Sequence, residues 1–312
     1  MKKLLSWASA IFGFAIFLVA LWVIRQELHG QSVAKIFHAA SMVRTSHLFF
    51  ALGLTVLCYL VLTGYDILAA LQLSDRRPRW RSIMLNSFIC HAISINVGCS
   101  SIMGGSIRCY YYLRKGIHAA DLVRVMSFCV GTFWLGFLAL GGALFLFIPP
   151  PIPSYLHLPF ATLQPVGMLL FLVLAFYLFI ILVRKKPISI KGFVIPVVRP
   201  QITIAQIVVS SSEWILGAAV LYVLLPHHTP NMYIHLLSFY FLAQVSGAAS
   251  QVPSGLGVFE SILLAFAPPG IDPSRVLASL LLYRLIFNLL PLIVAGMLLF
   301  AREVRFRRAS MA

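Results

Sequence analysis

The chain has 312 residues, of which 61% are hydrophobic and only 10% are charged, and its mean hydropathy is +0.95. In soluble domains about a quarter of the residues are charged, so this composition excludes a soluble protein and indicates an integral membrane protein. The formal net charge of +16 lies on short basic loops between apolar stretches. Such loops are typical of topology signals and of contacts with anionic lipid headgroups, so nucleic acid is not an expected partner.

Long apolar stretches follow one another from the N-terminus. A helix needs about 20 apolar residues to cross a bilayer. The first stretch follows Lys2-Lys3 like a signal peptide, but no small-residue cleavage site comes after it, so we interpret it as an uncleaved anchor helix. The six predicted spans are 7–24, 45–73, 122–148, 161–183, 202–225 and 274–301. The sequence therefore predicts an all-α integral membrane protein, a polytopic helical bundle that forms a single transmembrane domain over 1–312.

Two polar, glycine-rich segments interrupt the apolar sequence, at 96–108 and 250–260. Each follows a shorter apolar segment, at about 82–97 and 232–249. In hydrocarbon an unpaired backbone group costs several kcal/mol, so a broken helix survives only in the protein interior or along a cavity. We interpret the two shorter segments as half-helices of re-entrant hairpins, which return through about 104–113 and 255–267.

The distribution of basic residues predicts the topology. Lys and Arg cluster in alternate loops, whereas the loops 149–160 and 226–235 contain neither. The positive-inside rule then places both termini, including the basic tail 302–312, in the cytoplasm, although basic residues within 25–44 dilute the pattern. The first hairpin would enter from the cytoplasm and the second from outside.

The two halves, 45–148 and 161–301, thus share a layout in opposite orientation, although their residue-level identity is negligible. Inverted repeats of this kind place a substrate site near the bilayer midplane and suit alternating access.

Of the eight acidic residues, three lie within or beside apolar segments: Asp66, Glu213 and Glu260. A charge at the centre of a membrane helix costs roughly 2.5–3.5 kcal/mol on insertion scales, so such residues usually face the interior and pair. The basic candidates are Arg108, at the end of the first break, and Arg284, inside the last span. Either one could contact Glu260 or an anionic substrate. Internal ion pairs that only hold the bundle together are the alternative.

The backbone of the breaks favours an anion. Gly104-Gly105 and the glycines at 255 and 257 permit positive φ and close backbone approach, and Pro253 removes a donor. Half-helix N-termini built in this way attract anions such as phosphate, although packing through small residues is the alternative. The predicted substrate-binding residues are Asp66, Asn96, Gly104, Gly105, Arg108, Glu213, Pro253, Ser254, Gly255, Gly257, Glu260, Tyr283 and Arg284.

No cofactor, metal site or catalytic residue is predicted. The five cysteines are dispersed without metal-ligand spacing, and the odd number gives no disulfide framework. His91, on the half-helix before the first break, is the histidine to consider as a proton carrier, with a hydrogen-bonded core histidine as the alternative.

These motifs carry a resemblance to a family. The run from Tyr65-Asp66 through Asn96, Gly98, Gly104-Gly105-Ser106-Ile107-Arg108, Gly116 and Phe133-Trp134-Leu135-Gly136 resembles the transmembrane region of lysylphosphatidylglycerol synthase/flippase proteins. The later run Val252-Pro253-Ser254-Gly255-Leu256-Gly257-Val258-Phe259-Glu260 is similar to that family's Pro-x-Gly-x-Gly-x-x-Glu signature, and Tyr283-Arg284 to its Tyr-Arg pair. The resemblance covers about 45–300.

The resemblance implies a domain of the bacterial inner membrane that moves aminoacylated or other phospholipids between leaflets, often as a homodimer. The family's synthases carry a large soluble transferase domain after the membrane region, whereas this sequence ends at Ala312. Synthase activity is therefore not expected, and a flippase or lipid transporter is the leading hypothesis. The alternatives are an intramembrane enzyme acting on a lipid phosphate, with Asp66 or Glu260 as general base, and a scaffold for another membrane enzyme.

Overall fold

The computed structural model describes most of the chain from Val33 onward. The described residues are 33–73, 79–96, 108–109, 112, 118–151, 161–183, 188–190, 193–195, 199–226, 230–250, 252–265 and 272–311. The predicted anchor at 7–24 lies outside these residues, as does most of the first break, including Gly104 and Gly105.

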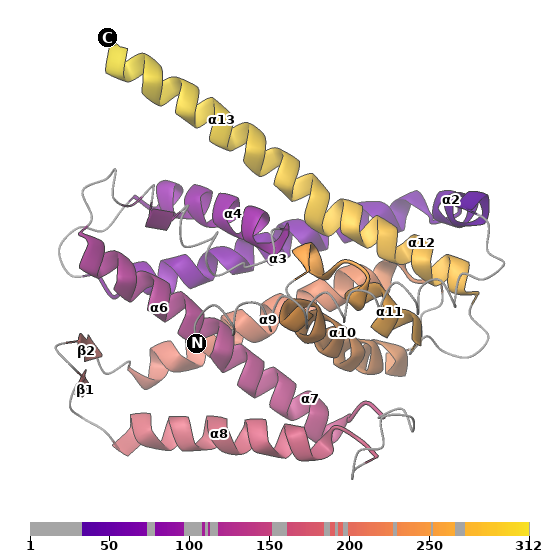
Figure 1. The fold of residues 1–312 in the computed structure, drawn as a ribbon, viewed down its shortest axis with the longest axis horizontal. Coiled ribbons are helices and arrows are strands. Elements are labelled where there is room, and N and C mark those ends of the chain that lie inside the picture. Colours follow the sequence, from indigo (N-terminus) through magenta and orange to yellow (C-terminus); the bar gives the residue numbers. More distant parts are fainter. Residues whose placement is uncertain are drawn as a thin grey trace, which may run out of the picture.

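The described elements are almost all helical (Figure 1). In chain order they are α2 (Val33–Ser41), α3 (Thr45–Ala70), α4 (Trp80–Asn96), α6 (Ala119–Gly136), η1 (Phe137–Gly141), α7 (Gly142–Phe147), α8 (Gln164–Val183), β1 (Ile188–Ile190), β2 (Phe193–Ile195), α9 (Pro200–Leu224), α10 (Pro230–Ser250), η3 (Pro253–Gly255), α11 (Val258–Ala265), α12 (Pro273–Tyr283), η4 (Arg284–Leu289) and α13 (Leu290–Met311). Strands β1 and β2 form one short antiparallel hairpin. The predicted all-α membrane bundle is confirmed, with this hairpin as its small β addition.

Within the described residues, six helical stretches are long and apolar enough to cross a membrane. They are Thr45–Ala70, Asp121–Phe147, Gln164–Val183, Pro200–Leu224, Met232–Ser250 and Pro273–Arg302. Five of them match predicted spans. The sixth is α10, with 21 residues, which contains the segment 232–249 that the sequence predicts as a half-helix. Its length is sufficient for a crossing, and its place in a re-entrant hairpin stays a prediction. Helix α4, with 17 residues, is not among the six.

The chain does break after α10, as the second glycine-rich segment predicts. A 3-10 turn, η3, follows, and α11 then lies beside α10 (Figure 1). The backbones touch at Gly247 and Gly255, where a Cβ built on Gly255 would lie 2.9 Å from Cα of Gly247. A hairpin of this shape requires glycine at the contact. Whether it enters and leaves on the same side of the bilayer stays a prediction, as does the opposite orientation of the first hairpin.

Helices α3 and α9 form the centre of the bundle and pack along each other. At their contact Gly64 faces Val209, and a Cβ at Gly64 would lie 3.0 Å from the valine side chain.

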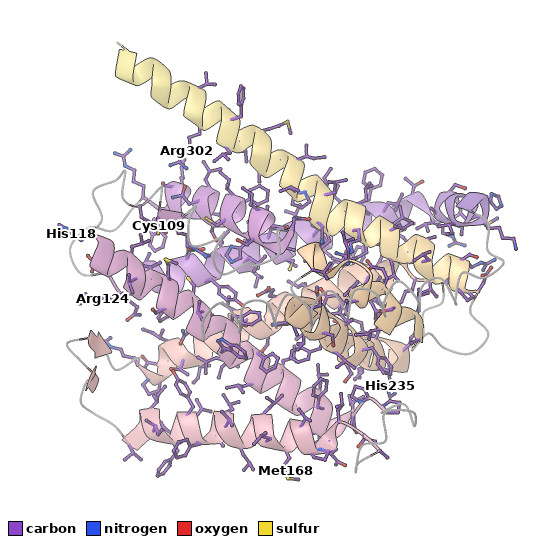
Figure 2. The ribbon with its side chains drawn as sticks, in the orientation of Figure 1. Cys109, His118, Arg124, Met168, His235 and Arg302 are labelled. Atoms are coloured by element: carbon purple, nitrogen blue, oxygen red, sulfur yellow. The ribbon has the colours of Figure 1, made fainter. Side chains whose placement is uncertain are left out.

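Helix α8 lies at one edge, and its Met168 projects away from the bundle (Figure 2). Exposed apolar side chains along α8 indicate a lipid-facing surface. His118 and Arg124 lie at the opposite end of the bundle from His235 (Figure 2). Which of these ends faces the cytoplasm stays a prediction.

The last predicted span is not one regular helix. A π-helical segment, η4, lies between α12 and α13. Pro291 has no N–H to donate to the carbonyl of Phe287 four residues earlier. The hydroxyl of Tyr59 on α3 donates to that carbonyl at 3.2 Å, and Nδ2 of Asn96 on α4 donates to the next one, Asn288, also at 3.2 Å. Neighbouring helices thus donate to two carbonyls of the interrupted helix, and for Phe287 this bond replaces the one that Pro291 cannot make, as a membrane interior requires.

Candidate functional site

A cavity of about 220 Å³ lies where α4, α9, α10, η3 and η4 meet. Its lining mixes aromatic, polar and charged side chains. The lining residues are Ser94, Ile95, Phe133, Glu213, Trp214, Tyr240, Gln244, Gly247, Ala248, Val252, Ser254, Gly255, Phe259, Tyr283, Arg284, Phe287 and Asn288. A polar cavity between helices that can cross a membrane is where an intramembrane ligand can be held.

The second break forms one wall of this cavity in a left-handed conformation. Ser254, Gly255 and Gly257 have φ values of 55°, 61° and 83°. Glycine adopts this region without steric cost, whereas serine does so only when its surroundings hold it there. The prediction of positive φ at both glycines is confirmed.

Glu260 connects the break to the last span. It lies in the first turn of α11, where its Oε2 accepts the backbone N–H of Gly257 at 2.8 Å, the reach-back contact of a capping box. Its Oε1 accepts Nε of Arg284 at 2.7 Å. The carboxylate is 9% exposed. Both of its oxygens are therefore occupied by bonds that hold the break in place.

Arg284 has more donors than its pair with Glu260 uses. Nη1 donates to the hydroxyl of Ser254 at 2.6 Å and also to the Ser254 carbonyl, and the guanidinium lies 5.2 Å from the ring centroid of Phe259. Nδ2 of Asn288 donates to the same hydroxyl at 2.8 Å. Nη2 of Arg284 is buried and has no hydrogen-bond partner among the described residues. One strong donor of a cavity-lining cation therefore remains available.

Glu213 lines the cavity from α9. Its Oε2 accepts the hydroxyl of Tyr65 on α3, and the Tyr65 hydroxyl also contacts the hydroxyl of Ser210 at 2.8 Å. No basic side chain in the described part of the chain forms an ion pair with Glu213. The cavity therefore contains a partly satisfied cation and an acid without a counterion.

Asp66 forms a separate cluster with Arg108 and His91. Arg108 donates from Nε and Nη2 to the two oxygens of Asp66, at 2.8 and 3.0 Å. Nδ1 of His91 lies 3.9 Å from the Asp66 carboxylate and 2.9 Å from the carbonyl of Ser87. None of these residues lines the cavity. The predicted pairing of intramembrane charges thus holds for Asp66 and Glu260, with Arg108 joined to the former and Arg284 to the latter.

The predicted site residues therefore fall into groups. Those that line the cavity are Glu213, Ser254, Gly255, Tyr283 and Arg284. Glu260 and Gly257 support the cavity through Arg284, and Pro253 begins η3. Asn96 reaches the cavity wall through the carbonyl of Asn288, whereas Asp66 and Arg108 lie apart from it.

Sequence reasoning missed several lining residues, of which Asn288 is the most informative. Its side chain is 6% exposed, and its Oδ1 finds no donor among the described residues. A lone amide within an apolar span is a signal that could have identified it. Gln244 and Tyr240 belong to the same polar wall, since Nε2 of Gln244 donates to the Tyr240 hydroxyl at 2.9 Å, and that hydroxyl contacts the one of Tyr283 at 2.8 Å.

Comparisons with known proteins agree with this architecture. No family model matches the chain. An uncharacterised protein of Synechocystis is 33% identical over 97% of this chain and 94% of its own length. The inner membrane protein YbhN of Escherichia coli is 29% identical over 94% of this chain and 90% of its own length. The phosphatidylglycerol lysyltransferase of Staphylococcus haemolyticus is 26% identical over 94% of this chain but only 34% of its own length.

The similarity to the lysyltransferase is thus confined to about a third of that enzyme, whereas the first two relatives match almost end to end. Together with six candidate spans, this makes the chain a multi-pass protein of the bacterial inner membrane. The chain belongs to the membrane-protein family whose transmembrane domain is shared with the lysylphosphatidylglycerol synthase/flippase proteins.

Proposed function

We propose that this protein moves a phospholipid between the leaflets of the membrane, with the lipid headgroup held in the cavity between α9, α10 and η4. The observation that carries the proposal is Nη2 of Arg284, a buried donor of a cavity-lining cation without an acceptor among the described residues. A guanidinium is the side chain best suited to a phosphate, because its planar donors match phosphate oxygens. Trp214, whose Nε1 also lacks a partner there, adds a second donor to the same cavity.

A second, apolar cavity supports a lipid as the ligand. It has a volume of about 350 Å³, lies between α3, α4 and α13, and is lined by Leu52, Thr55, Val56, Tyr59, Leu60, Thr63, Met84, Phe88, Leu290, Pro291 and Val294. The hydroxyls of Thr55 and Thr63 are bonded to carbonyls of their own helix, so this lining offers little to a polar group. Tyr59 lines this cavity and bonds to Phe287, which lines the polar one. A headgroup and an acyl chain therefore find adjacent environments of matching polarity.

The proposal extends to the mechanism that the sequence layout suggests. The two breaks would act as the moving elements of an inverted repeat, exposing the cavity first to one leaflet and then to the other. A homodimer is part of the same proposal. Lysyl transfer is not, because the similarity to the lysyltransferase covers only about a third of that enzyme.

The test is headgroup accessibility in proteoliposomes that contain a short-chain fluorescent phospholipid and purified protein. Wild type should expose label from the inner leaflet to an added membrane-impermeant quencher faster than protein-free vesicles do. Arg284→Gln and Glu260→Gln should lower that rate at least tenfold. Arg124→Gln is the matched control, because Arg124 forms an exposed ion pair with Asp121 and is not a cavity residue. Wild-type rates in both cavity variants would overturn the assignment of the site.

The same vesicles test the leading alternative. Mass spectrometry of the lipids after incubation should recover the phospholipid unchanged. A new lipid species formed by wild type and absent with Arg284→Gln would instead identify an intramembrane enzyme.

A further inference from the structure

We infer that Glu213 carries a proton while the cavity is empty and releases it when the ammonium group of a lipid headgroup binds, so that this protein exchanges amine-bearing phospholipids for protons. The inference rests on the proposed function and adds to it a coupling ion and a class of headgroup.

The three intramembrane acids differ in their counterions. Asp66 accepts two bonds from Arg108, and Glu260 accepts one from Arg284 together with a backbone N–H. The Glu213 carboxylate instead accepts a hydrogen bond from the neutral hydroxyl of Tyr65. Within the described residues, Glu213 is thus the acid of this set that lacks a cation.

The groups that face Glu213 from the neighbouring helices do not supply that cation. Helix α6 contributes the apolar ring of Phe133, and the charge of Arg284 is balanced by Glu260. The titratable groups near Glu213 are Cys58, Tyr59 and Tyr65 on α3 and Tyr240 on α10. Tyr283 and Arg284 line the same cavity from the last span. The phenols and the thiol are neutral at physiological pH. Among the described residues, the groups around Glu213 therefore carry no net positive charge.

An isolated carboxylate in such a place is expensive. Removing a charge from water without pairing it costs several kcal/mol, and a carboxyl group avoids this cost by binding a proton. The empty cavity is therefore most stable with Glu213 as the neutral acid, whose O–H can donate within the cavity. Intramembrane acids serve as proton relays in pumps and transporters.

A headgroup that carries both a phosphate and an ammonium reverses this balance. Its phosphate oxygen would accept Nη2 of Arg284, and its ammonium would supply the counterion that Glu213 lacks. The O–H bond of the carboxyl group then breaks, the proton passes to water on the side to which the cavity is open, and an ammonium–carboxylate pair forms. On the opposite side the ammonium leaves and a proton returns to the carboxylate. One proton thus moves against each lipid.

A headgroup without an amine makes no such exchange. Phosphatidylglycerol would contact Arg284 through its phosphate and leave Glu213 protonated. The two lipid classes therefore differ in the proton that they displace, which provides a readout separate from transport itself.

The experiment uses proteoliposomes with an imposed pH gradient and a lumenal pH dye, loaded with short-chain fluorescent phosphatidylethanolamine or phosphatidylglycerol. With an acidic lumen, wild type should drive phosphatidylethanolamine into the inner leaflet and raise the lumenal pH. Phosphatidylglycerol should move at a rate that the gradient leaves unchanged. Glu213→Gln should abolish both the dependence on the gradient and the pH change. Glu213→Asp should retain them, and Asp121→Asn is the control for an exposed acid.

The outcomes separate the two proposals. Movement of phosphatidylethanolamine that ignores the gradient in wild type overturns the proton exchange and leaves the flippase intact. A gradient response that persists in Glu213→Gln assigns the proton to another group and overturns this role of Glu213. Absence of movement for both lipids overturns the proposed function and the inference together.

Discussion

The two buried arginine–carboxylate pairs contain the same chemical groups but differ in what remains unbound. Arg108 spends Nε and Nη2 on both oxygens of Asp66. Arg284 gives only Nε to Glu260 and turns Nη1 toward the broken helix at Ser254, and its Nη2 has no partner in the part of the chain that the structure describes. The first pair uses both oxygens of its carboxylate and lies away from the cavity. The second holds a helix break and, among the described residues, has a donor without a partner on a cavity-lining side chain.

This difference indicates separate roles. A bidentate pair that occupies both carboxylate oxygens suits a joint between α3 and the end of the first break. An arginine that bonds to an acid and to a loop, and whose Nη2 has no partner among the described residues, suits a ligand-binding role. The distinction can be tested because the two pairs should respond differently to substitution.

The largest effect on folding is expected at the first pair. Asp66→Ala leaves the Arg108 guanidinium buried without its carboxylate, which should cost about 3–5 kcal/mol of stability. Thermal unfolding in detergent, followed by circular dichroism, should show a large fall in melting temperature. Arg284→Gln should lower it less, because Glu260 keeps the Gly257 N–H. Equal losses for the two variants would remove the distinction between the pairs.

An intermediate effect is expected at the break itself. Gly255→Ala places a Cβ at φ +61° and 2.9 Å from Cα of Gly247. A left-handed conformation costs a non-glycine residue roughly 1–2 kcal/mol, and the contact forces the turn away from α10. Lipid movement should fall at least tenfold while the protein remains folded. Gly53→Ala is the control, because a Cβ there meets nothing within 4 Å. If Gly255→Ala transports as wild type does, the position of the break is not critical for the cavity.

The smallest effect is expected from removing the Ser254 hydroxyl, to which Arg284 of the second pair donates. Ser254→Ala deletes the acceptor shared by Arg284 and Asn288, but the Ser254 carbonyl still accepts from Nη1. The free energy of unfolding should fall by about 1–2 kcal/mol, since the charge-assisted bond from Nη1 to the Ser254 carbonyl survives. The transport rate should fall a few fold in the accessibility assay, with an unchanged preference between lipids. Complete loss of transport would show that the hydroxyl itself contacts the headgroup.

The sequence predicts the spans well because apolar length is a strong signal in a membrane protein. It also locates the second break, where Pro253 and the glycines at 255 and 257 force an irregular backbone. It also names Arg108 and Arg284 as candidate partners but cannot assign each to its acid, since 42 residues separate Asp66 from Arg108 and 24 separate Glu260 from Arg284. Only the packing of the helices brings these side chains together.

Two features of the fold escape sequence reasoning for a physical reason. The length of α10 is one of them: the short apolar segment 232–249 runs straight into the break and suggests a half-helix, whereas α10 has 21 residues and keeps its polar ones against η3 and the cavity. The π segment η4 depends on donors from α3 and α4, and periodicity within the last span does not reveal them.

The bonds from Tyr59 and Asn96 to the carbonyls of Phe287 and Asn288 have a consequence for how this protein can evolve. Both acceptors belong to the main chain, so no substitution at 287 or 288 removes them. Only the donors can be lost, and loss of Tyr59 exposes the Phe287 carbonyl, which Pro291 has already deprived of its regular helical partner. Substitutions at this joint are therefore accepted in one order. A residue with an N–H in place of Pro291 would supply a donor to the Phe287 carbonyl, and only after that change can Tyr59 be replaced without loss of a hydrogen bond.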